Sequence, residues 1–260
     1  MIKEHNKIYK YRKEIDGFRA FAVISVIINH INNGILPSGY LGVDIFFVIS
    51  GYVITLSLSK KKNINFQKFI NNFYTKRIKR ILPPLAFVVL VNSIIISFFR
   101  SDVSGSLKTG MASLFGVSNF ALFWASKDYF AETTLLNPFT HTWSLGVEEQ
   151  FYFLFPFIIW ITGFSRKNQN SSRNFFLLIM TLGIFSVVNF IFLYSTNQPA
   201  AYFLMPFRFW EIATGCIAFL VNSKKYLWIE KVKRIPSSVI LLLIIVCMLL
   251  PVSSGAILTI

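Results

Sequence analysis

Two ionisable residues in the first apolar segment of the chain, Arg19 and His30, could do chemistry inside a membrane. They are eleven residues apart. That is roughly three helical turns, so both lie on one helix face, about 16 Å apart along the axis. Ionisable groups in a membrane helix are costly and usually face a polar interior. An imidazole suits general-base work on a hydroxyl. The spacing therefore indicates either a polar path across the bilayer with chemistry at His30, or a snorkelling Arg19 with a solvated His30 at the helix end.

Three acidic residues in apolar segments are further candidates for catalysis, namely Asp44, Glu148 and Glu149. Asp44 stands at the outer end of the second apolar segment, where it is expected near the level of His30 and could orient the imidazole. The alternative is a helix-start Asp stabilised by amide dipoles. Glu148 and Glu149 open a strongly apolar helix, and because adjacent helical residues point about 100° apart, they are expected to take different roles. One would face a polar cavity and contact the acceptor, while the other would cap the helix or face solvent.

The remaining candidates are basic or paired residues near the edges of apolar segments. Arg77 and Arg80 share a helix face, and two guanidinium groups at a membrane entrance can clamp phosphates. The alternative for this pair is a cytoplasmic anchor to anionic lipid. Arg208 and Glu211 share a face of another apolar segment and form either a structural ion pair or part of a substrate site. His141, which precedes a membrane entry, is a second candidate for the imidazole, and no metal site is expected.

The composition is that of a membrane protein. The chain has 260 residues, of which 54% are apolar and 17% aromatic, with only 14% charged. A net charge of +15 would suggest a nucleic-acid partner in a soluble protein. Here most basic residues gather between apolar segments, which is the positive-inside pattern, so no nucleic acid is expected and these stretches are predicted to be cytoplasmic. The basic stretches are 1–14, 60–80, 164–173 and 223–234.

The apolar runs predict an all-α fold, a polytopic integral membrane helical bundle of about seven to eight membrane segments, with one membrane domain over 1–260 and no soluble domain. Segment 106–125 is weakly apolar, and a crossing there would place the basic stretch 164–173 outside. It is therefore expected to be re-entrant or to lie at the outer interface. The span 82–99 is expected to hold its two adjacent prolines in the first turn. The other expected spans are 15–33, 40–59, 143–163, 174–194, 201–221 and 237–258.

Five sequence runs together resemble the membrane acyltransferase family called acyltransferase type 3, which includes bacterial O-acetylases of surface polysaccharides. The family's basic residue, ten intervening positions and His match Arg19 and His30, and its Arg-x-x-Arg pair matches Arg77 and Arg80. The five runs are EIDGFRAFAVISVIINH, GYLGVDIFFVISGYVIT, FYTKRIKRILPP, NPFTHTWSLGVEEQFYFLFP and MPFRFWEIATG, in this order between residues 14 and 215.

The resemblance implies an enzyme that transfers an acyl group, expected to be acetyl, from cytoplasmic acyl-coenzyme A to a hydroxyl of an extracytoplasmic polysaccharide. The polysaccharide could be a lipopolysaccharide O-antigen, a capsule, an exopolysaccharide or peptidoglycan. Acetyl-coenzyme A is then a donor substrate, and no permanently bound cofactor is expected. His30 is implied as the catalytic residue, while Arg19, Arg77 and Arg80 are implied to hold the donor. The expected partners are this donor, a polysaccharide or lipid-linked sugar acceptor and membrane lipids, in a multi-pass bacterial inner-membrane protein with a cytoplasmic N-terminus.

Two departures from the family keep other functions open. The runs look most like the subgroup that often carries a C-terminal SGNH hydrolase-like domain, and no such domain is expected within these 260 residues. Family members also have more membrane spans, so the chain is expected to be truncated at its C-terminus, with a partner chain supplying the missing helices or the SGNH domain. The alternatives are a membrane transporter of a small or lipid-linked solute, which would also place Arg19, His30 and Glu211 along a polar path, or an inactive family fragment.

Overall fold

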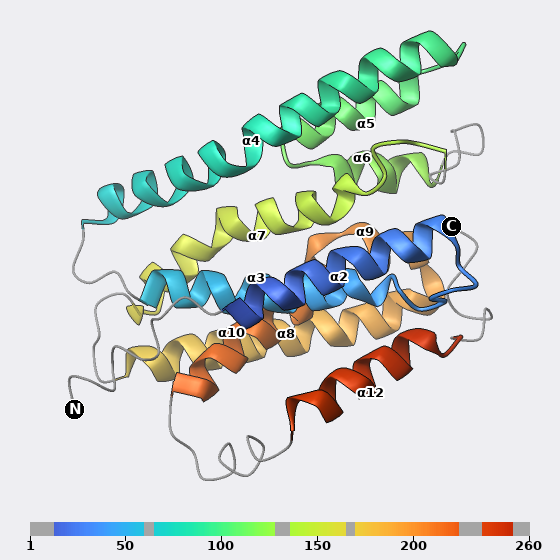
Figure 1. The fold of residues 1–260 in the computed structure, drawn as a ribbon. Coiled ribbons are helices and arrows are strands. Elements are labelled where there is room, and N and C mark those ends of the chain that lie inside the picture. Colours follow the sequence, from blue (N-terminus) through green and yellow to red (C-terminus); the bar gives the residue numbers. More distant parts are fainter. Residues whose placement is uncertain (1–12, 60–64, 128–135, 165–169, 224–235, 252–260) are drawn as a thin grey trace. The chain divides into compact units, whose positions relative to one another are not determined.

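The computed structural model describes residues 13–59, 65–127, 136–164, 170–223 and 236–251. Over these ranges the chain forms helices and no strand, which confirms the predicted all-α fold (Figure 1). The predicted stretch 1–14 and the predicted loops 60–80, 164–173 and 223–234 fall wholly or partly outside these ranges. The helices are α2 (Lys13–Ile31), α3 (Leu41–Ser59), α4 (Phe66–Phe99), α5 (Ser104–Leu114), α6 (Ser118–Ala125), α7 (Thr142–Ile161), α8 (Ser171–Thr196), α9 (Gln198–Phe203), α10 (Met205–Ser223) and α12 (Ser237–Leu249).

The chain divides into two compact units, whose boundary falls inside α10 between Trp210 and Glu211. The first unit holds α2, α3, most of α10 and α12, and the second holds α4 to α9 with the first turns of α10. In the first unit, α3 and α10 approach backbone to backbone through two glycines. Gly51 lies against the carbonyl of Ile212, and Gly215 lies against the carbonyl of Val48. Such close contacts between small residues are typical of membrane helix pairs, which lack a hydrophobic driving force between helices.

The same unit joins its N-terminal hairpin to α12. Gly42, at the start of α3, lies against the carbonyl of Ala22 in α2, so these two antiparallel helices are in close contact. In the turn between them, Ser38 donates its N–H to Met248 O (3.0 Å) and its hydroxyl to Leu250 O (2.8 Å). The end of α12 is therefore fixed at the turn that follows His30.

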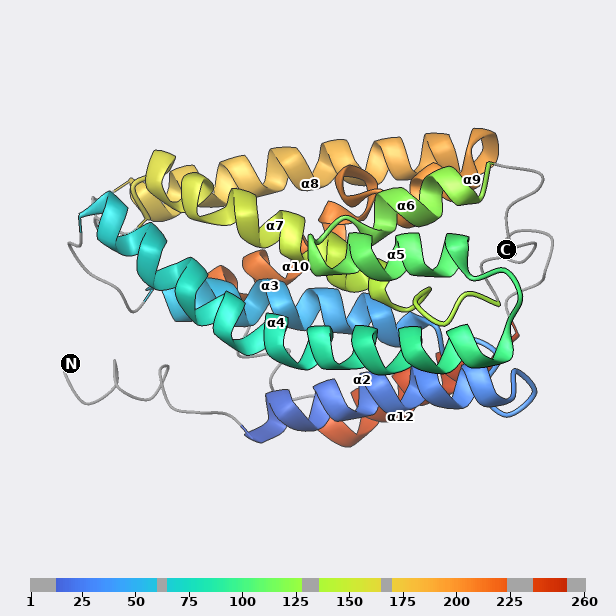
Figure 2. The same ribbon diagram turned by 90° about the horizontal axis from the view of Figure 1, so that it is seen from above.

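The second unit packs α4 and α5 side by side and sets α7 among α5, α6 and α9 (Figure 2). One core of this unit is formed by the buried residues Leu85, Val89 and Ile96 of α4 together with the buried Phe139. A second core is aromatic and lies along α7. There the Phe151 and Phe155 rings are 4.7 Å apart between centroids, and Phe155 contacts Phe175 of α8 at 5.9 Å.

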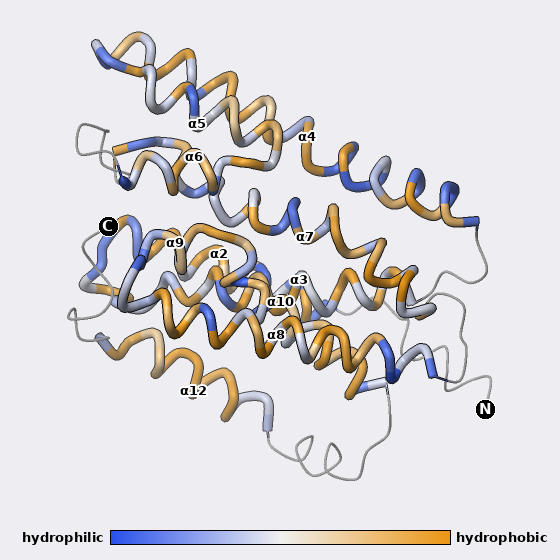
Figure 3. Tube along the Cα trace, turned by 180° about the vertical axis from the view of Figure 1, so that it is seen from behind, coloured by the Kyte–Doolittle hydropathy of each residue, from blue (hydrophilic) through white to orange (hydrophobic). Residues whose placement is uncertain are grey.

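Four helical stretches among the described residues are long and apolar enough to cross a membrane. They are Leu41–Ser59, Phe66–Phe99, Ser171–Thr196 and Gln198–Ser223. The hydropathy of the trace shows the long apolar runs of α8 and α12 (Figure 3). Exposed large apolar side chains line α4 and α8, where lipid tails would solvate them, as in a helical membrane bundle. They include Phe87, Leu90, Ile94, Phe98, Ile184, Phe185, Val188, Ile191 and Phe192.

Most predicted spans agree with the helices to within a few residues, but α4 does not. The span 82–99 was expected to begin at its prolines, whereas α4 begins at Phe66 and contains Pro83 and Pro84 in its interior. Each proline lacks the N–H that would bond the carbonyl four residues earlier, which costs stability at these positions. Arg77 and Arg80 therefore lie within a helix that continues into the apolar part of α4.

The predicted span 237–258 begins where α12 begins, and its end falls outside the described residues.

Segment 106–125 is not one helix. It forms α5 and α6, which are separated by a turn with Gly116 at φ 68°. At 1.5 Å per residue these helices are about 16 and 12 Å long, so neither reaches across the roughly 30 Å hydrocarbon core. The expectation that the segment is re-entrant or lies at the outer interface stays a prediction.

Candidate functional site

In the first unit, Arg19 faces α3 from the N-terminal half of α2. Its guanidinium carbon lies 5.8 Å from the centroid of the Phe46 ring. The side chain is half-buried, and its Nε has no hydrogen-bond partner among the described residues. A buried guanidinium N–H without an acceptor costs free energy, and an anionic or carbonyl-bearing ligand could accept its hydrogen bond.

Asp44 lies close to the level of Arg19. Gly42 packs against Ala22, and Phe46 lies under Arg19, so Asp44 falls between these two contacts. Because α2 and α3 are antiparallel, that places Asp44 about 2 Å from the level of Arg19 and about 14 Å from the level of His30 along the axis. The expectation that Asp44 lies at the depth of His30 is therefore wrong, and its reason is the register that Gly42 imposes.

His30 occupies the last turn of α2 and is exposed. The neighbouring Asn29 fixes the turn that follows, because its Nδ2 donates to Leu36 O (2.9 Å), Pro37 O (3.1 Å) and Asn33 Oδ1 (2.7 Å). The imidazole thus sits on a rigid helix end. Asn29 did not emerge from the sequence, although a polar residue beside the candidate base was a signal.

In the second unit, Arg77 of α4 stacks on an aromatic ring of α7. Its guanidinium carbon is 4.2 Å from the centroid of Tyr152, whose hydroxyl donates to Glu148 Oε1 at 2.9 Å. Tyr152 and Glu148 are both buried. Arg80 is exposed, so the two arginines have different surroundings and do not form a symmetric clamp. The sequence did not reveal Tyr152, although its position four residues after Glu148 places both on one helix face.

Glu148 and Glu149 occupy different environments, as their adjacency predicts. Glu148 is buried beside Tyr152, whereas Glu149 is half-buried against the backbone of Gly116. Neither lies in the first turn of α7, which begins at Thr142. The expectation that these two acids open the helix, with one of them as its cap, is therefore wrong, because a cap or a helix-dipole effect is confined to the first turn.

A buried amide network fixes the turn between α5 and α6 to α7 and α9. Gln150 Nε2 donates to Asn119 Oδ1 (2.7 Å) and to Gly116 O (3.1 Å), and Asn119 Nδ2 donates to Phe203 O (3.0 Å). Asn119 is fully buried. These residues were missed because each partner comes from a different part of the chain. Their role is to hold Glu149 and the start of α7 in place.

Arg208 lies buried in an aromatic cluster. Its guanidinium carbon is 5.6 Å from the centroids of Trp143 and Tyr202, and 5.9 Å from that of Phe190. Glu211, three residues further along α10, is also buried. The choice between an ion pair and a substrate site for these two residues stays a prediction. His141 is exposed at the N-terminal end of α7.

Within the ranges that the structure describes, no group of three or more His, Cys, Asp or Glu side chains could hold a metal ion. In the first unit, Arg19 lies by an aromatic ring and His30 is exposed at the end of α2. In the second unit, Arg77 and Arg208 lie over aromatic rings, Glu148 and Glu149 have different surroundings, and His141 is exposed. Guanidinium groups can bind phosphates, and an imidazole can move a proton.

Comparison with known proteins gives a family match over nearly the whole chain. A family model described as an acyltransferase domain matches residues 12–259. The O-acetyltransferase OatA of Staphylococcus aureus (strain NCTC 8325 / PS 47) is 36% identical over 221 residues, which cover 83% of this chain and 36% of that protein. The peptidoglycan O-acetyltransferase OatA of Listeria monocytogenes serovar 1/2a is 34% identical over 220 residues, covering 81% of this chain and 34% of that protein. The chain thus spans about a third of the length of these curated relatives. No solved structure matches it.

Proposed function

The chain belongs to this acyltransferase family, and from that premise we propose that it is a membrane O-acyltransferase domain that acetylates a cell-envelope glycan. The acetyl group comes from acetyl-coenzyme A at the cytoplasmic side of the bacterial inner membrane. It passes to a sugar hydroxyl on the outer side. Because the Listeria relative is named a peptidoglycan O-acetyltransferase, peptidoglycan is the acceptor we propose.

The observation that carries this proposal is the arrangement of Arg19 and His30 on α2. Arg19 is half-buried with a free Nε toward the predicted cytoplasmic end, and His30 is exposed at the other end of the same helix face. The two positions are about 16 Å apart along the axis, a distance that a long, thin pantetheine arm can bridge. This order supports a donor that enters from inside and an acceptor that waits outside.

The surroundings of Arg77 support its role in binding the donor. Stacking on Tyr152 uses the flat face of the guanidinium, so its N–H groups, which lie in the plane, stay available to phosphate oxygens. The hydroxyl bond from Tyr152 to Glu148 fixes the ring on which Arg77 rests. Arg80, exposed one turn further along, adds a second cation for the same phosphates.

In the proposed step, the His30 imidazole removes the proton of the sugar hydroxyl as its oxygen attacks the thioester carbonyl. The carbon–sulfur bond then breaks, and the coenzyme A thiolate takes the proton from the imidazolium. In a second form of the step, the imidazole attacks the thioester carbonyl, the carbon–sulfur bond breaks, and the coenzyme A thiolate takes the ring proton. The sugar hydroxyl then attacks the acetylimidazole, the carbon–nitrogen bond breaks, and the hydroxyl proton passes to the imidazole. Both forms require His30, and neither requires a bound cofactor.

The test is glycan acetylation by a His30→Ala variant in a bacterial host that lacks its own O-acetylation. Base-labile acetate on purified peptidoglycan should fall at least a hundredfold, because general-base catalysis contributes about 10²–10⁴. The amount of protein in the membrane fraction should be unchanged. A matched control is His5→Ala in the predicted cytoplasmic stretch 1–14, which should retain acetylation. Full acetylation by the His30 variant would refute the proposal.

A further inference from the structure

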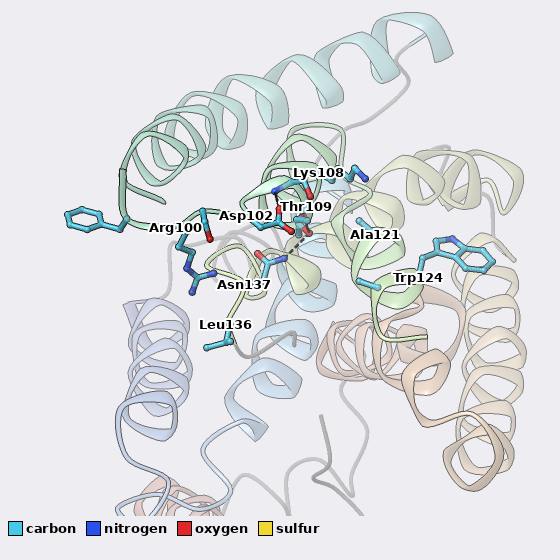
Figure 4. Close-up of a pocket in the computed structure, with 13 residues that line it drawn as sticks. Arg100, Asp102, Lys108, Thr109, Ala121, Trp124, Leu136 and Asn137 are labelled. Atoms are coloured by element: carbon cyan, nitrogen blue, oxygen red, sulfur yellow. Dashed lines mark hydrogen bonds between the residues drawn. The ribbon is translucent and has the colours of Figure 1, made fainter. Parts of the chain in front are cut away.

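An open pocket of about 950 Å³ lies in the second unit, where α4 ends and α5 begins (Figure 4). Several polar side chains in its wall already bind groups of the same wall. Asn137 Nδ2 donates to Thr109 Oγ1 at 2.9 Å. Hydrogen bonds from Ser104, together with the charge of Lys108, hold the pKa of Asp102 below its usual value. These groups are therefore engaged within the protein itself.

The turn that follows His30, in the first unit, differs because two of its side-chain amides are bonded only through their oxygens. Asn33 Oδ1 accepts from Asn29 Nδ2 at 2.7 Å, and Asn32 Oδ1 accepts from Gly34 N at 2.8 Å. Both asparagines are exposed, and neither of their Nδ2 atoms has a partner among the described residues. An amide that is fixed through its oxygen points its two N–H donors in a set direction.

The two amides lie on different sides of the helix end. Asn32 N bonds Ile28 O at 2.9 Å, so the helical course of α2 continues through Asn32. Residues three apart on a helix share a face, whereas residues two apart do not. Asn33 follows His30 by three residues, and Asn32 follows it by two. The Asn33 amide is therefore placed beside the imidazole, and the Asn32 amide is placed away from it.

The turn that carries Asn33 is also held at its other end. Asn29 Nδ2 donates to two backbone carbonyls of this turn, at 2.9 and 3.1 Å. Gly39 lies against the carbonyl of Ser25 in α2, and Ser38 is bonded to the end of α12. Donors on such a fixed frame act strongly on a developing charge, because they need no reorganisation at the moment of reaction.

The proposed acyl transfer creates such a charge next to His30. When a nucleophile attacks the thioester carbonyl, the electron pair of the C=O double bond moves onto the oxygen. The pair returns to form the C=O bond again as the carbon–sulfur bond breaks. An N–H donor aimed at this oxyanion stabilises the transition state, and removing one such donor costs about 10²–10³ in kcat.

We propose that the Asn33 amide donates to this oxyanion and is a further catalytic residue of the site. The proposal rests on the proposed function for the reaction at His30. Asn29 is then a positioning residue, because its bond to Asn33 Oδ1 sets the direction of the Asn33 N–H groups.

The test compares kcat and KM of acetyl transfer to peptidoglycan for variants of the full chain in membranes. Asn33→Ala should lower kcat about a hundredfold and leave the KM for donor and for acceptor nearly unchanged, because the oxyanion exists only beyond the ground state. Asn29→Ala should lower kcat by a smaller factor. The double variant should be no slower than Asn33→Ala alone, because Asn29 acts through Asn33. A further loss in the double variant would overturn the positioning role.

The matched control is Asn32→Ala, which removes the same exposed amide from the other side of the same turn. This variant should keep the parental kcat, and all variants should reach the membrane in equal amounts. Parental kcat in Asn33→Ala, an equal loss in Asn32→Ala, or a higher acceptor KM without a change in kcat would overturn the proposal. If His30→Ala is inactive in the same assay, such a result leaves the proposed function standing.

Discussion

The guanidinium of Arg77 rests 4.2 Å above the ring of Tyr152, and this contact joins α4 to the middle of α7. Tyr152 in turn bonds the buried Glu148 at 2.9 Å. A cation over an aromatic ring outside bulk water is worth about 2 kcal/mol. The contact therefore holds Arg77 in one orientation, whereas the exposed Arg80 keeps its conformational freedom.

The first prediction concerns the ring under Arg77. Tyr152→Ala should raise the KM for acetyl-coenzyme A about tenfold or more, since loss of a contact worth about 2 kcal/mol would leave Arg77 unoriented. The kcat should change less, because Tyr152 is not expected to touch the reacting atoms. Steady-state kinetics in membranes, with acetate on glycan as the readout, separates the two constants.

Tyr152→Phe is the control for that change, because it keeps the ring and removes only the hydroxyl bond to Glu148. It should raise the donor KM by a smaller factor than Tyr152→Ala. If both variants keep the parental KM, the stack has no part in donor binding.

The second prediction separates Arg77 from Arg80. Arg77→Ala should weaken donor binding about tenfold or more, whereas Arg80→Ala should have a smaller effect that fades at high salt, because an exposed charge is screened by ions. Equilibrium binding of coenzyme A to nanodisc-embedded protein measures both. Unchanged donor affinity in both variants, together with weaker association with anionic lipid, would favour the lipid-anchor interpretation of the pair.

The sequence was sufficient to predict the fold class, because long apolar runs between basic loops leave few alternatives to membrane helices. It misplaced the start of α4, since paired prolines usually mark a first turn. Here Pro83 and Pro84 lie seventeen residues or more after the helix start at Phe66. Packing of Phe69 and Phe73, both buried, holds that earlier part of the helix together.

The candidate residues themselves could be found from the sequence, because ionisable groups in apolar segments are few. The residues that contact them could not be found in this way. Tyr152 meets Arg77 only once α4 and α7 pack together, and Asn119 meets Gln150 only once α6 and α7 pack together. The level of Asp44 likewise depends on a helix register that no local pattern encodes.

The third prediction concerns the backbone contact between α3 and α10. A Cβ at Gly51 would collide with the carbonyl of Ile212, so Gly51→Ala should force the helices apart and cost about 1–3 kcal/mol. Its thermal unfolding midpoint in detergent should fall. Gly17→Ala in α2 is the control, because nothing lies within 4 Å of that position and alanine favours the helix. A Gly51 variant as stable as the Gly17 variant would show that the close approach is absent.

The last prediction concerns Asn119, which is fully buried and bonds both Gln150 and the carbonyl of Phe203. Asn119→Leu keeps the side-chain volume but leaves Gln150 and the Phe203 carbonyl without their hydrogen-bond partner. This loss should lower the free energy of unfolding by about 1–3 kcal/mol. The substitution should also loosen the turn at Gly116, which faces Glu149. Unfolding midpoints in detergent measure the loss.

Asn92→Leu in α4 is the matched control, because Asn92 Nδ2 bonds only the carbonyl of Val88 four residues earlier, at 2.9 Å. That carbonyl also accepts the ordinary helical N–H bond, so the substitution should change stability by no more than about 0.5 kcal/mol. An equal fall in midpoint for the two variants would mean that the Asn119 network adds nothing beyond a surface amide. A fall in the midpoint for Asn119→Leu alone would establish that this single side chain fixes α5 and α6 to α7 and α9.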